Sequence, residues 1–314
     1  MMIALMIAGG LILLALGAEG LVRGSGSLAL RMGVTPLVVG LTIVAFGTGS
    51  PELVVCIEAA LAGNSDIALG NVVGSNISNI ALILGISALI RPLEVRSELL
   101  RREVPLMIGV TLLLCLLLLD GALSRPEGVL LVAGSVAYTW LTYWAASRNR
   151  GDALVEEASG EAAALPRRRT WLDILFIACG IAALVLGARL LLDGAIVVAG
   201  WLGISQIVIG LTIVAVGTSL PELATSAVAA HKGEADVAFG NVVGSNVLNI
   251  LFMLGVAAVI QPMSAAGLRA FDLGALLASA VLLLPVLWSG SILSRKEGVL
   301  LVAAYAAYVY TLVP

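Results

Sequence analysis

One block of this chain occurs twice, 170 residues apart. Residues 40–53 read GLTIVAFGTGSPEL, and residues 210–223 read GLTIVAVGTSLPEL. Both copies are strongly apolar, and each carries a proline followed by a glutamate, Glu52 in the first copy and Glu222 in the second. A charged side chain at the centre of a bilayer costs about 2.5–3.5 kcal/mol on insertion scales. Two such residues at equivalent repeat positions predict one site that both halves of the protein build together.

The composition indicates the class of protein. Of the 314 residues, 60% are hydrophobic and only 12% are charged, whereas soluble domains carry about 25% charged residues. We therefore expect an all-α membrane protein. About 20 apolar residues are needed to cross a bilayer as a helix, and by that measure the chain holds ten spans. The predicted spans are 2–22, 33–61, 66–89, 103–120, 127–146, 171–192, 202–230, 236–260, 270–288 and 297–313.

The repeat extends well beyond the first block. Residues 66–76 read DIALGNVVGSN and return as residues 236–246, which read DVAFGNVVGSN. Each half therefore has five spans, and because five is odd, the second half must enter the membrane from the opposite side. This arrangement predicts two inverted five-helix repeats, an architecture found in many secondary transporters. The predicted domains are a first repeat at 1–146, a linker at 147–169 and a second repeat at 170–314.

Basic residues are distributed unevenly between the two sides of the predicted membrane. The loops after the odd-numbered spans hold 14 of the 17 lysines and arginines, and only Arg125, Arg189 and Arg269 fall on the other side. Basic loops of membrane proteins stay in the cytoplasm. We therefore expect a multi-pass protein of the cytoplasmic membrane, with both termini outside and the central loop at 147–169 in the cytoplasm.

The prolines of the repeated block interrupt two apolar spans. Pro51 and Pro221 each remove a backbone donor and clash with the preceding turn. Each span should therefore be kinked or broken, which frees backbone carbonyls such as those of Ala45 and Ala215. Irregular backbone at membrane depth is tolerated where it lines a cavity.

Oxygen-bearing side chains accompany these breaks. Ser75 and Asn79 are four residues apart and therefore share one helix face, and the same spacing returns in the second repeat. Carboxylate, amide, hydroxyl and carbonyl oxygens suit hard cations such as Ca²⁺ and Na⁺ better than zinc, copper or iron. Two carboxylates match the charge of one Ca²⁺ or two Na⁺. The candidate side chains are Glu52, Glu222, Thr48, Thr218, Ser75, Ser245, Asn71, Asn76, Asn79, Asn241, Asn246 and Asn249.

These motifs resemble those of a known family. Gly-Thr-x-x-Pro-Glu followed by Gly-Asn-x-x-Gly-Ser-Asn, at 47–52 with 70–76 and again at 217–222 with 240–246, is similar to the two α-repeats of the cation/calcium exchanger superfamily. Within it, the chain resembles the prokaryotic sodium/calcium antiporters, over essentially all ten spans. The resemblance implies ion sites between spans 2, 3, 7 and 8. It also implies that spans 1 and 6 slide as a unit to give alternating access.

The resemblance also implies a role for individual residues. Glu52 and Glu222 would be central ligands, and Asn79 matches a family asparagine, whereas Asn249 falls where several sodium/calcium exchangers have aspartate. Ser219 matches a family serine ligand, but Gly49 stands at that place in the first repeat. The family pattern implies three Na⁺ for one Ca²⁺, while charge counting alone favours two. The ligands implied for flanking sodium sites are Ser75, Ser245, Thr48, Thr218 and the carbonyls of Ala45 and Ala215.

These observations predict a secondary antiporter that exchanges Na⁺ for Ca²⁺ across the membrane. Its partners would be these two ions and the lipid bilayer, with no cofactor and no nucleic acid. Proton-coupled calcium exchange is an alternative, because a glutamate pair also carries protons, and a passive cation channel is a second one. An enzyme is not expected, because the sequence has no His-Glu-x-x-His motif, no phosphate loop and no nucleophile with a credible histidine base.

Overall fold

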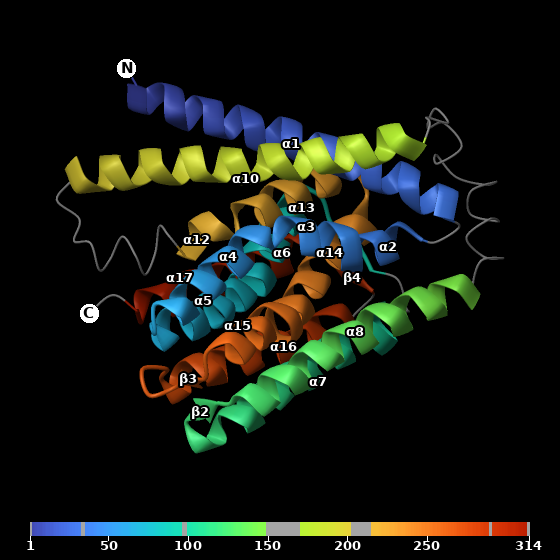
Figure 1. Ribbon diagram of the computed structural model, residues 1–314. Coiled ribbons are helices and arrows are strands. Elements are labelled where there is room, and N and C mark those ends of the chain that lie inside the picture. Colours follow the sequence, from blue (N-terminus) through green and yellow to red (C-terminus); the bar gives the residue numbers. More distant parts are fainter. Residues whose placement is uncertain are drawn as a thin grey trace.

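Apolar runs fold into helices throughout this computed structural model (Figure 1). The structure describes residues 2–32, 35–95, 99–148, 170–201, 215–288 and 291–312. The helices of the first repeat are α1 (Met2–Met32), α2 (Pro36–Val39), η1 (Gly40–Val44), α3 (Ala45–Thr48), α4 (Ser50–Leu61), α5 (Ser65–Ser78), η2 (Asn79–Ile83), α6 (Leu84–Ile90), η3 (Leu99–Glu103), α7 (Val104–Leu117), η4 (Leu118–Asp120) and α8 (Arg125–Arg148).

The second repeat follows the same order. Its helices are α10 (Thr170–Trp201), α12 (Ala215–Thr218), α13 (Leu220–Lys232), α14 (Ala235–Leu248), η7 (Asn249–Leu254), α15 (Gly255–Ile260), α16 (Ala270–Trp288) and α17 (Arg295–Tyr310). Over its described residues each predicted span is helical apart from residue 35 and turns at Gly49, Ser219 and residues 311–312, which confirms the all-α architecture. Residues 202–214 of the seventh span and residues 149–169 of the predicted linker lie outside the described residues.

Two helices are longer than the sequence predicted. α1 and α10 have 31 and 32 residues, so the predicted ends at residues 22 and 192 were wrong. Arg23 had suggested the end of the first span. It lies on α1 instead, where its Nε pairs with Glu19 Oε1 one turn earlier, at 2.5 Å. The ion pair compensates the charge, and the helix continues.

The helices divide into a central pair and an outer set. In the segments 65–90 and 235–260, 72% and 78% of the most apolar window is buried, against 28–39% for the other four long spans. The outer helices expose large apolar side chains such as Leu16, Val136 and Leu186, as expected for contact with lipid. By length and composition, six of the described helices can cross a membrane, and the bent pair Leu37–Thr48 and Ser50–Leu61 can form a seventh.

Two pairs of very short strands join the repeats outside the helices. β1 (Leu93–Glu94) pairs antiparallel with β4 (Ile292–Leu293), and β2 (Ala122–Leu123) pairs with β3 (Met263–Ser264). The loops after spans 3 and 9 therefore meet at one end of the bundle, and those after spans 4 and 8 meet at the other (Figure 1). This is the arrangement that two inverted repeats require.

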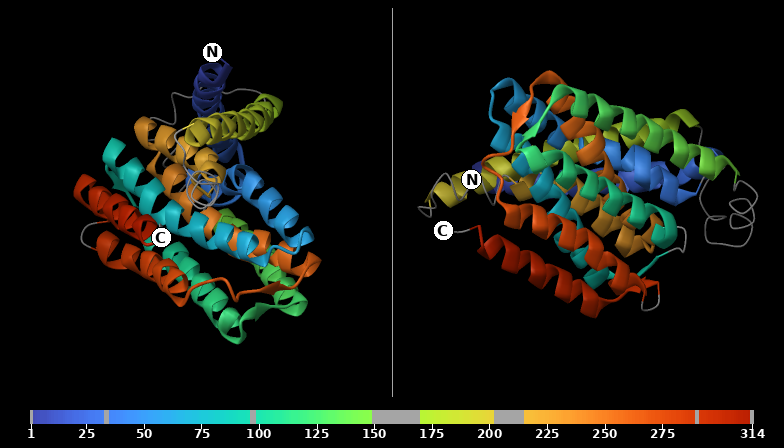
Figure 2. Two further views of the ribbon diagram at one scale, coloured as in Figure 1. Left: turned by 90° about the vertical axis from the view of Figure 1, so that its left-hand side faces the viewer. Right: turned by 90° about the horizontal axis from the view of Figure 1, so that it is seen from below.

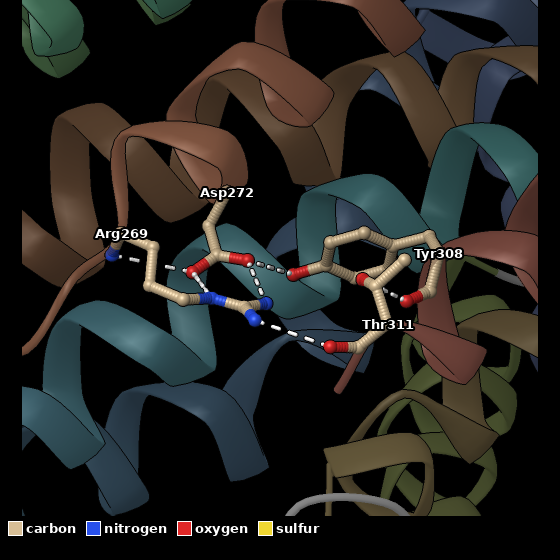
Figure 3. Close-up of polar contacts among 4 residues, drawn as sticks. All are labelled: Arg269, Asp272, Tyr308 and Thr311. Carbon is tan, nitrogen blue, oxygen red and sulfur yellow. Dashed lines mark hydrogen bonds and ion pairs between the residues drawn. The ribbon is translucent and has the colours of Figure 1, made fainter. Parts of the chain in front are cut away.

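A polar clamp holds the last helix against the start of α16. Arg269 donates from Nε and Nη2 to the two oxygens of Asp272, at 2.9 and 2.7 Å, in a bidentate pair. Its Nη1 donates to the Thr311 carbonyl at 3.1 Å, and the Tyr308 hydroxyl donates to Asp272 Oδ1 at 3.2 Å (Figure 3). The clamp therefore fixes the end of α17 to the preceding helix.

The first repeat has a corresponding clamp at its own last helix. Arg102 pairs with Glu103 at 3.6 Å and donates from Nη2 to the Leu141 carbonyl at 3.1 Å. Leu141 is the repeat equivalent of Thr311, 170 residues earlier. Each repeat thus ends by fastening its fifth helix to its fourth.

α1 and α10 form a separate pair along one side of the bundle (Figures 1 and 2). Glycines recur every seven residues on both helices, and they allow a very close backbone approach. A Cβ on Gly17 would lie 2.8 Å from the Gly180 carbonyl oxygen, and a Cβ on Gly10 would lie 2.8 Å from that of Gly187. The pair also belongs to an apolar cluster distinct from the main core, made of Leu14, Ala18, Leu21, Ala29, Val39, Val44, Ile177, Leu184 and Ala188.

This packing predicts different effects for two adjacent glycines. Gly10→Ala introduces a methyl group against the α10 backbone, whereas Gly9→Ala meets nothing within 4 Å. We expect Gly10→Ala to destabilise the protein by about 1–3 kcal/mol, a typical cost of overpacking. Gly9→Ala should leave stability unchanged or raise it slightly, because alanine favours helix. Thermal unfolding of the two variants in detergent measures the difference, and equal stabilities would contradict the close α1–α10 contact.

Candidate functional site

A bend in the second span brings its glutamate into the interior. α3 ends at Thr48 and α4 begins at Ser50, with an angle of 47° between the segments on either side. Pro51 occupies the first turn of α4, where its missing N–H costs nothing. Glu52 follows in the same turn, at the positive end of the helix dipole. In the second repeat, Glu222 lies in the first turn of α13.

The two carboxylates lie together and meet hydroxyl groups of the opposite repeat. Glu52 and Glu222 are each 1% exposed and interact electrostatically with one another. Ser219 donates its hydroxyl to Glu52 Oε1 at 3.1 Å. The Thr218 hydroxyl also approaches Glu52, and the Thr48 hydroxyl approaches Glu222. The structure therefore buries both acids in one place, and their role as ion ligands stays a prediction.

Among the described residues, several buried oxygen atoms have no hydrogen-bond partner, and six of them recur at equivalent positions of the two repeats. They form two equivalent sets of one carboxylate, one hydroxyl and one amide oxygen, each set from one repeat. A buried polar atom without a partner carries a desolvation cost of about 1–3 kcal/mol, and the recurrence of these six atoms in both repeats makes them candidate ligand positions. The atoms are Glu52 Oε2, Ser75 Oγ and Asn79 Oδ1 with Glu222 Oε2, Ser245 Oγ and Asn249 Oδ1.

The amide groups of α5 and α14 determine which way these oxygens face. Asn79 donates its Nδ2 to Asn246 Oδ1 at 3.1 Å, and Asn249 donates its Nδ2 to Asn76 Oδ1 at 2.9 Å. Asn76 in turn donates to the Asn246 carbonyl at 3.1 Å. Because both amide nitrogens are engaged across the repeat interface, the two amide oxygens are left for another ligand. Sequence reasoning had grouped Asn76 and Asn246 with the ligands and missed this positioning role.

A second pair of asparagines holds the broken spans in place. Asn241 donates to the Glu222 carbonyl at 3.3 Å and accepts from the Thr48 hydroxyl at 3.2 Å. Asn71 donates to the Glu52 carbonyl at 3.5 Å and accepts from the Thr218 hydroxyl at 3.4 Å. Each asparagine thus joins a glutamate helix of its own repeat to a threonine of the other. The sequence had placed both residues among the candidate oxygen-bearing side chains, and in the structure their amides join helices.

Local widening of two helices accompanies the amide ligands. The π-helical turns η2 and η7 begin at Asn79 and Asn249, at equivalent positions of the repeats. Such turns occur often at functional sites.

The two backbone carbonyls expected as ligands, those of Ala45 and Ala215, are not among the six side-chain oxygens described above. The Ala45 carbonyl accepts the Gly49 N–H at 3.1 Å and the Thr48 hydroxyl at 3.5 Å, so it is not left free by the bend. The Ser50 hydroxyl donates to the Gly47 carbonyl at 2.9 Å. Ala215 begins α12, directly after the residues that the structure does not describe. The roles of both alanine carbonyls stay predictions.

Comparison with known proteins gives the family. The sequence profile of the family described as "Sodium/calcium exchanger protein" matches residues 2–144 and 172–313. The putative antiporter CaxA of Alkalimonas amylolytica is 42% identical over 310 residues, which cover 96% of each chain. The sodium/calcium exchanger MaX1 of Methanosarcina acetivorans is 33% identical over 336 residues, again 96% of each chain.

The chain belongs to the sodium/calcium exchanger family.

A solved structure of a family member has the same fold as this exchanger. The sodium-calcium exchanger NCX_Mj is similar with a TM-score of 0.85, at 29% identity, over 99% of both chains. The predictions of ten helices in two inverted repeats, of the cation/calcium exchanger superfamily and of a transporter rather than an enzyme are therefore confirmed. The protein is a cation/calcium antiporter, and the ions are its cargo.

The amide exchange predicts a positioning role for Asn246. Asn246→Ala removes the oxygen that holds the Asn79 amide, so the Asn79 oxygen loses its fixed direction. We expect Ca²⁺ affinity to fall about 10–100-fold, as for other residues that orient metal ligands. Calorimetric titration of the purified exchanger in detergent measures this change.

Ser87→Ala is the control for this prediction. It removes a buried hydroxyl of α6 that has no partner, about two helical turns beyond Asn79, and it should leave Ca²⁺ affinity unchanged. If Asn246→Ala binds Ca²⁺ as tightly as the parent protein at similar stability, the amide exchange does not position the ligand.

Proposed function

We propose that the protein exchanges Na⁺ for Ca²⁺ across the cytoplasmic membrane, at one site that both repeats build. The observation that carries this proposal is the doubled set of buried oxygens around Glu52 and Glu222. All of these oxygens are hard ligands, which suit Ca²⁺ and Na⁺. The names of the relatives MaX1 and NCX_Mj point to the same two ions.

Charge balance explains why the two ions would exchange. Two ionised carboxylates in a buried site need compensating positive charge, because an uncompensated buried charge is costly. A single Ca²⁺ supplies that charge, and so do Na⁺ ions at overlapping oxygens. The site therefore holds one kind of cargo or the other, which is the condition for antiport.

Alternating access would use α1 and α10 as the moving part. The two helices are packed tightly on one another through glycines, and their apolar cluster is distinct from the main core. Ile181 of α10 lies directly over Gly47, next to Thr48 of the site, and a Cβ on Gly47 would lie 2.9 Å from Ile181 Cγ1. A slide of the pair along the bundle would therefore change what covers the ion-binding residues.

Replacement of either glutamate tests the site. We expect Glu52→Gln and Glu222→Gln each to lower Na⁺-driven Ca²⁺ uptake more than about 100-fold, because even residues behind the ligands typically account for 10–100-fold in metal affinity. Uptake of radioactive Ca²⁺ into proteoliposomes, with Na⁺ and pH varied separately, measures the effect. Glu58→Gln is the matched control, because Glu58 lies on the same helix and is exposed.

The same assay separates the alternatives. Uptake driven by a pH gradient without Na⁺ would favour proton coupling, and uptake that continues without any counter-ion would favour a passive channel. Near-normal exchange in either glutamine variant would remove that glutamate from the site.

We also propose an orientation in the membrane. The excess of basic residues on one side and the strand pairs at the two ends of the bundle support cytoplasmic loops after spans 1, 3, 5, 7 and 9. Both termini would then lie outside. A phosphatase fused after Pro314 should be active and a green fluorescent protein there should be dark, because each reporter works on one side only. The reverse pattern would contradict this orientation.

A further inference from the structure

An ion pair joins the α1–α10 pair to the rest of the bundle. Lys232 is the last residue of α13, and its Nζ lies 2.6 Å from Oε2 of Glu19 on α1. The other carboxylate oxygen of Glu19 pairs with Arg23, one turn further along α1. Both oxygens of Glu19 are therefore bound, and one of them is bound across to α13.

A different ion pair lies within the α1–α10 pair itself. Arg31 of α1 binds Asp173 of α10 at 2.8 Å, and the Asp173 side chain is 1% exposed. A slide of α1 and α10 as a unit would leave this contact intact. The same slide would separate Glu19 from Lys232, because Lys232 belongs to the bundle and not to the moving pair.

The end of α13 holds Lys232 in a defined position. Gly233 follows it with a left-handed backbone (φ 81°), and its N–H donates to the Ala230 carbonyl at 3.0 Å. The N–H of Glu234 donates to the Ala229 carbonyl at 2.9 Å. These two hydrogen bonds form a Schellman motif, which ends the helix. The contact with Glu19 therefore depends on where α1 lies, and not on how α13 ends.

The inverted repeat offers no such pair of charges at the equivalent positions. The equivalent of Glu19 is Arg189 on α10, and the equivalent of Lys232 is Ala62, which follows α4. The backbone turns there in the same way, because Gly63 also has a positive φ, of 73°. In the mirrored position of the moving pair, Arg189 would therefore meet a methyl group where Glu19 now meets an ammonium group.

We propose that Glu19 and Lys232 form a latch that favours one of the two access states of this exchanger. The latch is closed in the position of α1 and α10 seen here, and the mirrored position has no equivalent contact. The ion pair therefore biases the equilibrium between the states that open to the two sides of the membrane. This inference rests on the proposed alternating access by α1 and α10.

Distance measurements between two spin labels test the latch. The labels replace Leu5 of α1 and Val136 of α8, which are both exposed, so that a slide of α1 changes their separation. Cys115 and Cys179 are changed to serine, and the buried Cys56 is kept. The full-length exchanger is studied in liposomes with equal Na⁺ on both sides. Two distance populations then report the two positions of the moving pair.

Loss of either charge should open the latch. We expect Glu19→Gln and Lys232→Gln each to shift the ratio of the two populations about two- to fivefold away from the position seen here, as for other partly exposed ion pairs. The double variant should shift the ratio no further than either single variant, because each removes the same contact. Added choline chloride should shift the parent protein in the same direction, because salt screens the pair.

Two further variants are the controls. Lys296→Gln neutralises an exposed lysine of α17 and should leave the ratio unchanged. Glu58→Gln should also leave it unchanged, although Glu58 lies one turn before Ala62 on α4. A shift toward the position seen here in Glu58→Gln would show that Arg189 finds a partner in the mirrored position, which would overturn the one-sided bias.

The remaining outcomes separate the latch from the proposed function. Two populations whose ratio is the same in Glu19→Gln as in the parent protein would overturn the latch and leave the slide in place. A single distance in every variant and at every ion concentration would contradict the slide and the latch together. Na⁺-driven Ca²⁺ uptake by the same proteoliposomes would then show whether exchange itself persists.

Discussion

Two carboxylates held side by side away from water need positive charge, and no lysine or arginine among the described residues forms an ion pair with them. Glu52 and Glu222 are each 1% exposed, and the ion pairs of the described lysines and arginines are made with other acids. The balance must come from a cation or a proton that enters the site. The bound cation is therefore part of the charge balance of the folded protein. Without it, the change of access from one side of the membrane to the other would leave two buried carboxylates uncompensated, which disfavours cycling of the empty site.

The inverted repeat determines how the site is assembled. Groups of one half are consistently oriented by the other half: Ser219 reaches Glu52, Asn241 reaches Thr48, and Asn246 holds the amide of Asn79. The two halves are inverted relative to one another in the membrane. The equivalent contacts of the two repeats therefore place comparable ligands toward opposite sides of the membrane. The departure from this equivalence at Gly49 gives the two sides of the site different chemistry.

The sequence predicted the features that depend on local composition and on the repeat. The order of the spans follows from apolar length, although the ends of the first and sixth spans did not, and the break before Pro51 follows from that proline. The buried acids follow from the repeated block that holds them. The exchange of amide contacts between Asn76 and Asn246 could not be predicted, because it depends on how α5 crosses α14. The clamp at Arg269 could not be predicted from the repeat either. The first-repeat position equivalent to Arg269 is residue 99, whereas the arginine that forms the corresponding clamp is Arg102. The carbonyls that the two arginines bind, those of Thr311 and Leu141, are nevertheless equivalent.

The central claim is that one cation contacts a carboxylate from each repeat. Anomalous diffraction from crystals of the exchanger grown in Ca²⁺ without Na⁺ tests it most directly. We predict one Ca²⁺ peak inside the bundle, at about 2.3–2.6 Å from Glu52 Oε2 and from Glu222 Oε2 together. A Ca²⁺ ion bound by one of these glutamates alone, or by neither, would contradict the account.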